Sequence, residues 1–184
     1  MAADKDFTQE EANQFIIDCH ADLETVKKKA AAKPGLAHAY NPETDESALG
    51  AAAHIGRKDI AEFLLESGAQ LDIAAAAMLG RREDVQAFLE KDSNLATSGG
   101  AHGIPIAFHA ALGGDVEIAQ LLLDNGAGEA LKNALLGAVH MNRVEMARWL
   151  LDHGAITDAK DFEGRTALQM AEARGFDEIA AMLK

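Results

Sequence analysis

The chain of 184 residues is 48% hydrophobic, which is enough to bury a substantial core in one domain or in a short array of repeats. Its net charge of −13 argues against a nucleic-acid partner, because binding to a phosphate backbone depends on Lys and Arg. No run approaches the roughly 20 apolar residues that cross a bilayer. The first residues are acidic and polar, and Cys19 is the single cysteine, so we expect a cytoplasmic protein without membrane contact.

The chain repeats one pattern of residues. The segment "GRKDIAEFLLESGA" (56–69) returns as "GGDVEIAQLLLDNGA" (113–127) and as "NRVEMARWLLDHGA" (142–155). Each copy opens on a marker residue, and the markers are Gly56, Gly80, Gly114, Asn142 and Gly175, with an eroded copy at Ala21. Their successive spacings of 35, 24, 34, 28 and 33 residues are typical of stacked helical repeats.

Each copy predicts two helices around its marker. A helix rich in small residues precedes the marker, and a helix with apolar residues at helical spacing follows it. Gly or Asn at the marker tolerates the left-handed conformation that ends a helix. The first helices are expected at 47–55, 72–79, 105–113, 133–141 and 166–174. We therefore predict an all-α solenoid of stacked helix-turn-helix units in a single domain. Its parts are an N-terminal helical cap (1–40) and repeats at 41–69, 70–96, 97–127, 128–156 and 157–184.

Two segments carry a resemblance to a known family. "EGRTALQMAEARG" (163–175) and "GDVEIAQLLLDNGA" (114–127) resemble the ankyrin repeat, and the resemblance covers about residues 43–184. The T-P-L-H box of that family is nowhere intact, and its best copies here read S-A-L-G (47–50) and T-A-L-Q (166–169). With "AHGIPIAFHAALGG" (101–114), the chain is similar to stand-alone bacterial ankyrin proteins.

The uneven spacing predicts that some hairpin fingers are missing. A helix, a turn and a helix need about 24 residues, and the remaining nine or so of a full ankyrin repeat form a protruding hairpin. The 24-residue step from Gly56 to Gly80 therefore leaves no finger, and Asp72 is expected to cap the next helix directly. Full fingers are expected at 40–47, 97–105 and 157–165.

The resemblance also implies a binding surface. In the ankyrin family, the two residues before each marker and the finger tips face a concave groove, and we expect a non-catalytic module that binds a protein partner there. The implied partner-binding residues are His54, Ile55, Met78, Leu79, His102, Ile104, Leu112, His140, Met141, Phe162, Arg165 and Arg174. Because many of these are apolar, we expect an exposed hydrophobic strip. The alternative is that neighbouring repeats close over these side chains and make them core.

The sequence offers little evidence for catalysis or for a cofactor. The glycine-rich "SGGAHG" (98–103) lacks the ending of a phosphate loop and is read as a finger turn. The seven histidines form no H-E-x-x-H motif, so we predict no metal site, although zinc bound by His54, His102 and His140 stays open as an alternative. A second possible function is small-molecule binding or an enzyme-accessory role, with a pocket near Met78, Leu79, His102 and His109. We expect a monomer or a weak homo-oligomer.

Overall fold

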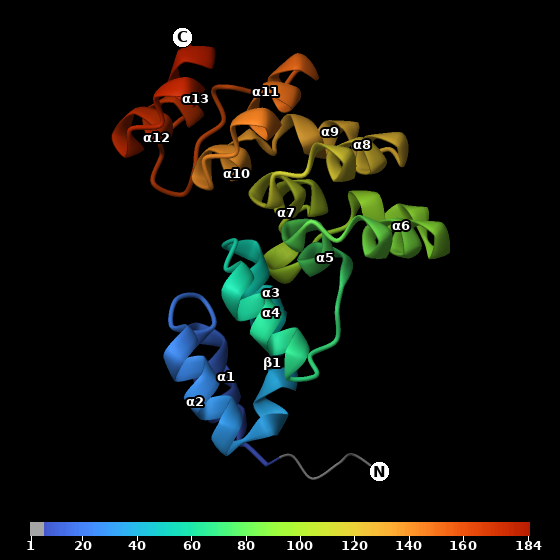
Figure 1. Cartoon of the computed structure of the whole chain (residues 1–184), viewed down its shortest axis with the longest axis vertical. Helices are drawn as coiled ribbons and strands as arrows, with labels where there is room; N and C mark the ends of the chain where they lie inside the picture. The colour runs from blue at the N-terminus through green and yellow to red at the C-terminus, as the bar shows by residue number, and fades with distance from the viewer. Residues whose placement is uncertain (1–5) are drawn as a thin grey trace.

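The computed structural model describes residues 6–184 of the chain, which form helical pairs stacked one after another (Figure 1). Two helices, α1 (Gln9–Asp18) and α2 (Leu23–Ala32), lie at the N-terminal end and are followed by the 3₁₀ helix η1 (Pro34–His38). Thr8 and Glu11 form a capping box that satisfies backbone N–H groups at the start of α1. The salt bridge of Lys33 with Glu11, 2.5 Å long, ties the end of α2 to the start of α1.

Five helical pairs follow, as the sequence predicted. The first helices lie within two residues of their predicted bounds, because alanine-rich segments favour helix and the markers end them. Backbone φ is positive at all five markers, including 51° at Asn142. The pairs are α3 (Ala48–His54) with α4 (Lys58–Glu66), α5 (Ile73–Leu79) with α6 (Arg82–Lys91), α7 (Ile106–Gly113) with α8 (Val116–Asp124), α10 (Leu135–His140) with α11 (Val144–Asp152), and α12 (Ala167–Arg174) with α13 (Asp177–Met182).

Three fingers occur where the spacing predicted them. The first is an antiparallel hairpin of β1 (Tyr40–Asn41) and β2 (Glu46–Ser47), and the others are closed by single bridges between Gly99 and Pro105 and between Lys160 and Thr166. The second finger contains the 3₁₀ helix η3 (Ala101–Gly103) and follows the 3₁₀ helix η2 (Ser93–Thr97). The 24-residue step has no hairpin in its described residues, and the Asp72 carboxylate accepts a hydrogen bond of 2.8 Å from Ala75 N, as a helix cap does. A short helix, α9 (Gly128–Lys132), stands before α10 in place of a finger.

Arginines tie neighbouring repeats together at their turns. Arg143 Nε donates a hydrogen bond of 2.9 Å to the carbonyl of Leu112, and Arg174 Nη1 donates one of 2.7 Å to the carbonyl of His140. Each bond joins one repeat to a carbonyl near the end of the preceding first helix. Because last-turn carbonyls of a helix have no partner within the helix, these side chains both satisfy them and fix the stacking.

The core divides into two clusters that meet at α5 and α7. One contains α1, α3 and α4 residues, and the other runs from α5 to α13. Met78 and Leu112 belong to the N-terminal cluster and are completely buried, so the prediction that they lie on an exposed strip is wrong. The alternative reading, in which repeats close over these positions, is confirmed for both.

The physical reason for this burial is the close approach of α7 to α5. A Cβ atom on Gly113 would lie 2.7 Å from the carbonyl oxygen of Ala77, so only glycine permits the contact. The side chain of Met141 packs against the turn at Gly56, where a Cβ atom would lie 3.1 Å from the Met141 sulfur. Met141, Ile55 and Leu79 are partly buried. The turns of the first, second, third and fourth helical pairs therefore converge.

Candidate functional site

The third finger projects one aromatic side chain into solvent. Phe162 lies at its tip and is 93% exposed. The loop around it is held by Asp161, whose Oδ1 accepts hydrogen bonds from the backbone N–H groups of Glu163 (2.9 Å) and Arg165 (2.8 Å). Asp161 Oδ2 accepts two more from the Arg165 guanidinium, at 2.9 and 2.8 Å. The finger therefore presents Phe162 from a loop whose shape is fixed by its own hydrogen bonds.

The electrostatics of this loop favour a charged Asp161. Burial raises the pKa of Asp161, but hydrogen bonds from the backbone and side chain of Arg165 outweigh it, so the pKa lies below its ordinary value. Arg165 also pairs with Glu163 at 2.8 Å. The charged partners of Arg165 thus both lie within its own finger, where these contacts stabilise the conformation of the tip.

A pocket with a volume of about 250 Å³ lies beside the third finger. Four of the predicted partner-binding residues line it, namely His140, Phe162, Arg165 and Arg174. Apolar side chains complete its wall: Phe108, Leu136 and Met170. This mixture of apolar wall and a few polar groups is the usual make-up of a binding pocket.

The surroundings of His140 in this pocket disfavour its charged form. Burial lowers the pKa of His140 below its ordinary value, and the positive charges of Arg174 and Arg165 lower it further. The Arg174 guanidinium lies 3.4 Å from His140 Nδ1 as well as donating to the His140 carbonyl. The polar edge of the pocket is therefore built by Arg174 and His140 together with the charged side chains of the finger, Asp161, Glu163 and Arg165.

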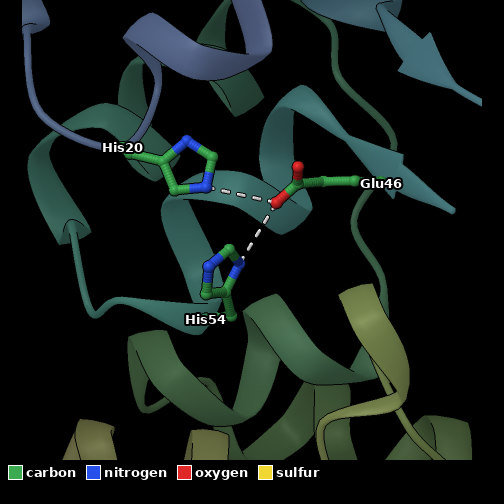
Figure 2. A group of neighbouring side chains, drawn as sticks. All are labelled: His20, Glu46 and His54. Carbon is green, nitrogen blue, oxygen red and sulfur yellow. Dashed lines mark ion pairs between the residues drawn. The ribbon is translucent and has the colours of Figure 1, made fainter. Parts of the chain in front are cut away.

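A second group of polar side chains lies toward the N-terminal end, around Glu46. Figure 2 shows His20 and His54 pointing at the Glu46 carboxylate from two sides. The Glu46 Oε1 atom is 3.3 Å from His20 Nε2, 3.3 Å from His54 Nδ1 and 3.0 Å from His102 Nε2. We call His20, Glu46, His54 and His102 the histidine–glutamate cluster. Glu46 is only 4% exposed, so the cluster has a buried negative centre.

Four separate segments bring these side chains together. His20 follows α1, Glu46 lies in β2, His54 ends α3, and His102 lies in η3 of the second finger. A Cβ atom on Gly50 would lie 3.1 Å from Ala101 Cβ, and this small-residue contact lets the second finger rest on α3. His102 has φ of 57°, a left-handed conformation that is uncommon for residues other than glycine.

The imidazole rings of the cluster interact with one another. The ring centroids of His20 and His54 are 5.0 Å apart, those of His54 and His102 are 5.3 Å apart, and both pairs meet edge to face. Burial lowers the pKa of His54, and charge on His20 lowers it further, while the Glu46 carboxylate opposes both. The rings therefore compete for the charge of a single carboxylate.

The predicted site residues thus separate into three groups. His140, Phe162, Arg165 and Arg174 come together at the third finger, whereas His54 and His102 belong to the histidine–glutamate cluster. Met78 and Leu112 are core, and Ile55, Leu79, Ile104 and Met141 are partly buried. The zinc alternative named His54, His102 and His140, but His140 lies in the C-terminal pocket and His20 and Glu46 take its place.

The alternative small-molecule pocket receives no support from the packing. Met78 and His109, which it would place on a pocket wall, are both completely buried. His109 Nδ1 donates to the Pro105 carbonyl at 3.0 Å. A larger hollow of about 670 Å³ lies elsewhere, between α1 and α2, where Ile17 is 61% exposed.

The structure is a stack of helical hairpins. Each hairpin turns at a residue in the left-handed conformation, and three of them are preceded by a finger. This arrangement defines a helical-repeat protein. The family model described as "Ankyrin repeats (3 copies)" matches residues 73–161 and 107–184, and the one described as "Ankyrin repeat" matches residues 44–76. Since these matches span more than half of the chain, the protein belongs to the ankyrin-repeat family, as its sequence pattern indicated. Comparison with curated proteins gave no match.

Ankyrin repeats are generally modules of protein–protein interaction and are typically non-catalytic. Across residues 6–184, each helix is too short or too polar to pass through a bilayer.

Proposed function

We propose that this protein is a non-catalytic module that binds a partner protein along its concave groove, with the third finger as the main contact. The observation that carries the proposal is the 93% exposure of Phe162 on a loop fixed by Asp161. Interface energy is concentrated in a few residues, and aromatic side chains are prominent among them. A rigid aromatic side chain also loses little conformational entropy when it is bound.

The pocket beside Phe162 supports the same role. A partner side chain can fill the volume against Phe108, Leu136 and Met170 while Phe162 packs on the partner's own surface. Arg174 and His140 at the edge offer N–H donors for a backbone carbonyl, and the Asp161 and Glu163 carboxylates in the same lining disfavour a negatively charged group there. Aromatic contact and pocket together fit an extended protein segment.

The charge of the chain indicates the kind of partner. With a net charge of −13, the protein favours a partner whose rim carries Lys and Arg, since complementary charges speed association and set orientation. The same charge disfavours nucleic acid. We therefore propose that the binding surface of the partner protein has an apolar centre, which receives Phe162, and a basic rim.

The test is affinity capture from the native cell followed by titration of each captured partner against purified variants. Phe162→Ala is expected to weaken binding by about thirtyfold, the equivalent of roughly 2 kcal/mol for an anchor residue. Ile17→Ala is the matched control, because Ile17 is also an exposed large hydrophobic residue but lies on the cap. Partners that bind Phe162→Ala as tightly as the unchanged chain would refute the role of the third finger.

A further inference from the structure

The histidine–glutamate cluster contains a buried oxygen atom that its surroundings leave unsatisfied. Glu46 Oε1 accepts no hydrogen bond from the residues that the structure describes, although three imidazole nitrogens lie 3.0–3.3 Å away. Buried polar atoms without a partner are rare in proteins, and a buried carboxylate oxygen is among the most costly to leave so. An additional positive group at this point would remove the cost.

His20 turns an unprotonated nitrogen toward this oxygen atom. His20 Nδ1 lies 3.0 Å from the Ile16 carbonyl and 3.2 Å from the Ile17 carbonyl, so this nitrogen carries the proton and donates it. In a neutral imidazole the other nitrogen then has no proton, and Nε2 turns its lone pair toward Glu46 Oε1 at 3.3 Å. Two lone pairs that face each other repel unless a cation lies between them.

One N–H from a neutral imidazole, such as His102 Nε2 at 3.0 Å, can satisfy Glu46 Oε1, but it leaves the lone pair of His20 Nε2 facing the carboxylate. Charging all three imidazoles would place three positive rings, 5.0 and 5.3 Å apart at their centroids, around one negative carboxylate. Like charges at that separation disfavour one another, above all where burial weakens screening by water. A single divalent cation can accept lone pairs from the imidazoles and the carboxylate at once. His54 Nδ1 lies 3.1 Å from the Gly50 carbonyl, so His54 must exchange that hydrogen bond for the ion when it binds.

The distances fit a tetrahedral metal ion. Zinc bonds of about 2.0–2.2 Å to imidazole nitrogen and carboxylate oxygen imply ligand atoms roughly 3.3–3.5 Å apart in a tetrahedron. The separations from Glu46 Oε1 to the three nitrogens, 3.0–3.3 Å, are close to that value. The ligand atoms of His20, Glu46 and His54 all lie within 4.8 Å of one another. His102 lies outside this group and approaches it through Glu46 alone, so its ring has to move toward His20 and His54 to complete a four-ligand site.

The surroundings also resemble those of a metal site. Metal-binding histidines usually donate their second N–H to a carbonyl or carboxylate, and the Nδ1 bond of His20 to Ile16 is such a contact. Exposure of the side chains increases from Glu46 through His54 and His20 to His102, so the site opens to solvent on the His102 side. Three imidazoles with one carboxylate suit zinc better than the hard ions magnesium or calcium.

We propose that His20, Glu46, His54 and His102 bind one zinc ion. With four protein ligands the site is closed, which is the arrangement of structural zinc sites. The ion joins the segment after α1, the first finger, the end of α3 and the second finger, and so fastens the cap to the repeats. This zinc site departs from the sequence expectation of no metal, and it is independent of the binding function of the third finger.

The experiment is titration of the metal-free full chain with zinc chloride, by calorimetry and by thermal melting. We expect one zinc ion per chain and a higher melting temperature at saturation. Cobalt(II) in place of zinc should give the visible absorption of a four-coordinate site. Glu46→Gln and His102→Asn should each weaken zinc binding by about tenfold or more. His102→Asn suits the test because asparagine tolerates the left-handed backbone at this exposed position.

His153→Gln is the matched control, because His153 is exposed and stacks on Trp149 away from the cluster. It should bind zinc as the unchanged chain does. Absence of binding at one equivalent in the unchanged chain would overturn the proposal directly. Equal affinity of the unchanged chain and His102→Asn, whose folding is checked by circular dichroism, would overturn the assigned ligands.

Discussion

The first and third fingers use the same position in opposite ways. Glu46 and Arg165 each precede the residue that caps the following helix, Ser47 and Thr166. Glu46 is turned into a buried cluster between the cap and the second finger, whereas Arg165 pairs with Asp161 inside its own finger. As a result the first finger contributes to the interior, and the third presents Phe162 to solvent.

The difference shows that a finger acquires its role from what packs on it. The base of the first finger is covered by the segment after α1 and by η3, so Glu46 meets other elements and not water, although residues 42–45 at the tip are exposed. The third finger has neighbours on one side, where α10 and α12 line its pocket. Position within the repeat alone therefore does not decide whether a residue is core or surface.

The largest predicted effect is a loss of folding stability when a charge is placed in the core of the N-terminal half. Met78→Glu would bury a carboxylate without a partner in the core that joins α3, α5 and α7, at a cost of at least about 4 kcal/mol. The melting temperature should fall by about 10 °C or more. Phe162→Glu on the third finger should change the free energy of unfolding by less than about 0.5 kcal/mol. Similar melting temperatures for both variants would contradict the division into inward and outward surfaces.

Leu122→Ala and Leu150→Ala test the stacking of the C-terminal half. Both side chains are buried between helical pairs, so each variant leaves a cavity and should cost about 2–5 kcal/mol. Denaturant melts give the value. Ile156→Ala, at a residue in the same region that is 39% exposed, is the control. The stacking register would be wrong if both leucine variants stayed within about 0.5 kcal/mol of the unchanged chain.

The contribution of His109 should appear as a dependence of stability on pH. Burial lowers the pKa of His109 from its ordinary 6.5, only partly opposed by its hydrogen bond to Pro105. The unfolded chain therefore binds a proton that the folded chain does not, and stability present above pH 6.5 is lost as the pH falls below it.

The loss from this one proton is at most about 1.4 kcal/mol per pH unit. We expect His109→Gln to reduce the slope of the free energy of unfolding between about pH 6.5 and 5, measured by urea titration at each pH. His153→Gln, which removes an exposed histidine, is the control measured beside it. An unchanged slope in His109→Gln would show that His109 is not held neutral.

Much of the fold could be predicted from the sequence, because local chemistry determines it. The marker residues, the cap at Asp72 and the missing finger all follow from turn conformations and from residue counts. The burial of Met78 and Leu112 could not be predicted in that way. It depends on how closely α7 approaches α5, and the repeat period carries no information on that distance.

The candidate site residues also divide into those that a position within one repeat singles out and those that depend on how separate segments pack together. Phe162, Arg165 and Arg174 were predictable because each has a defined place within one repeat. His20 and Glu46 were missed because the first follows a cap helix and the second lies in a finger strand, 26 residues apart in sequence. The one available signal was Glu46 itself, an acidic residue that stands just before the cap residue of an alanine-rich helix ending in His54.

The contrast between the two regions is tested most directly by amide hydrogen exchange with and without saturating zinc chloride. We predict that zinc slows exchange in the segments that carry the histidine–glutamate cluster, at about residues 16–21, 46–54 and 99–105. Exchange in the third finger, residues 157–165, should stay unchanged, since its shape comes from hydrogen bonds within the finger and not from the cluster. Zinc protection of the third finger, or no protection around Glu46, would contradict the account.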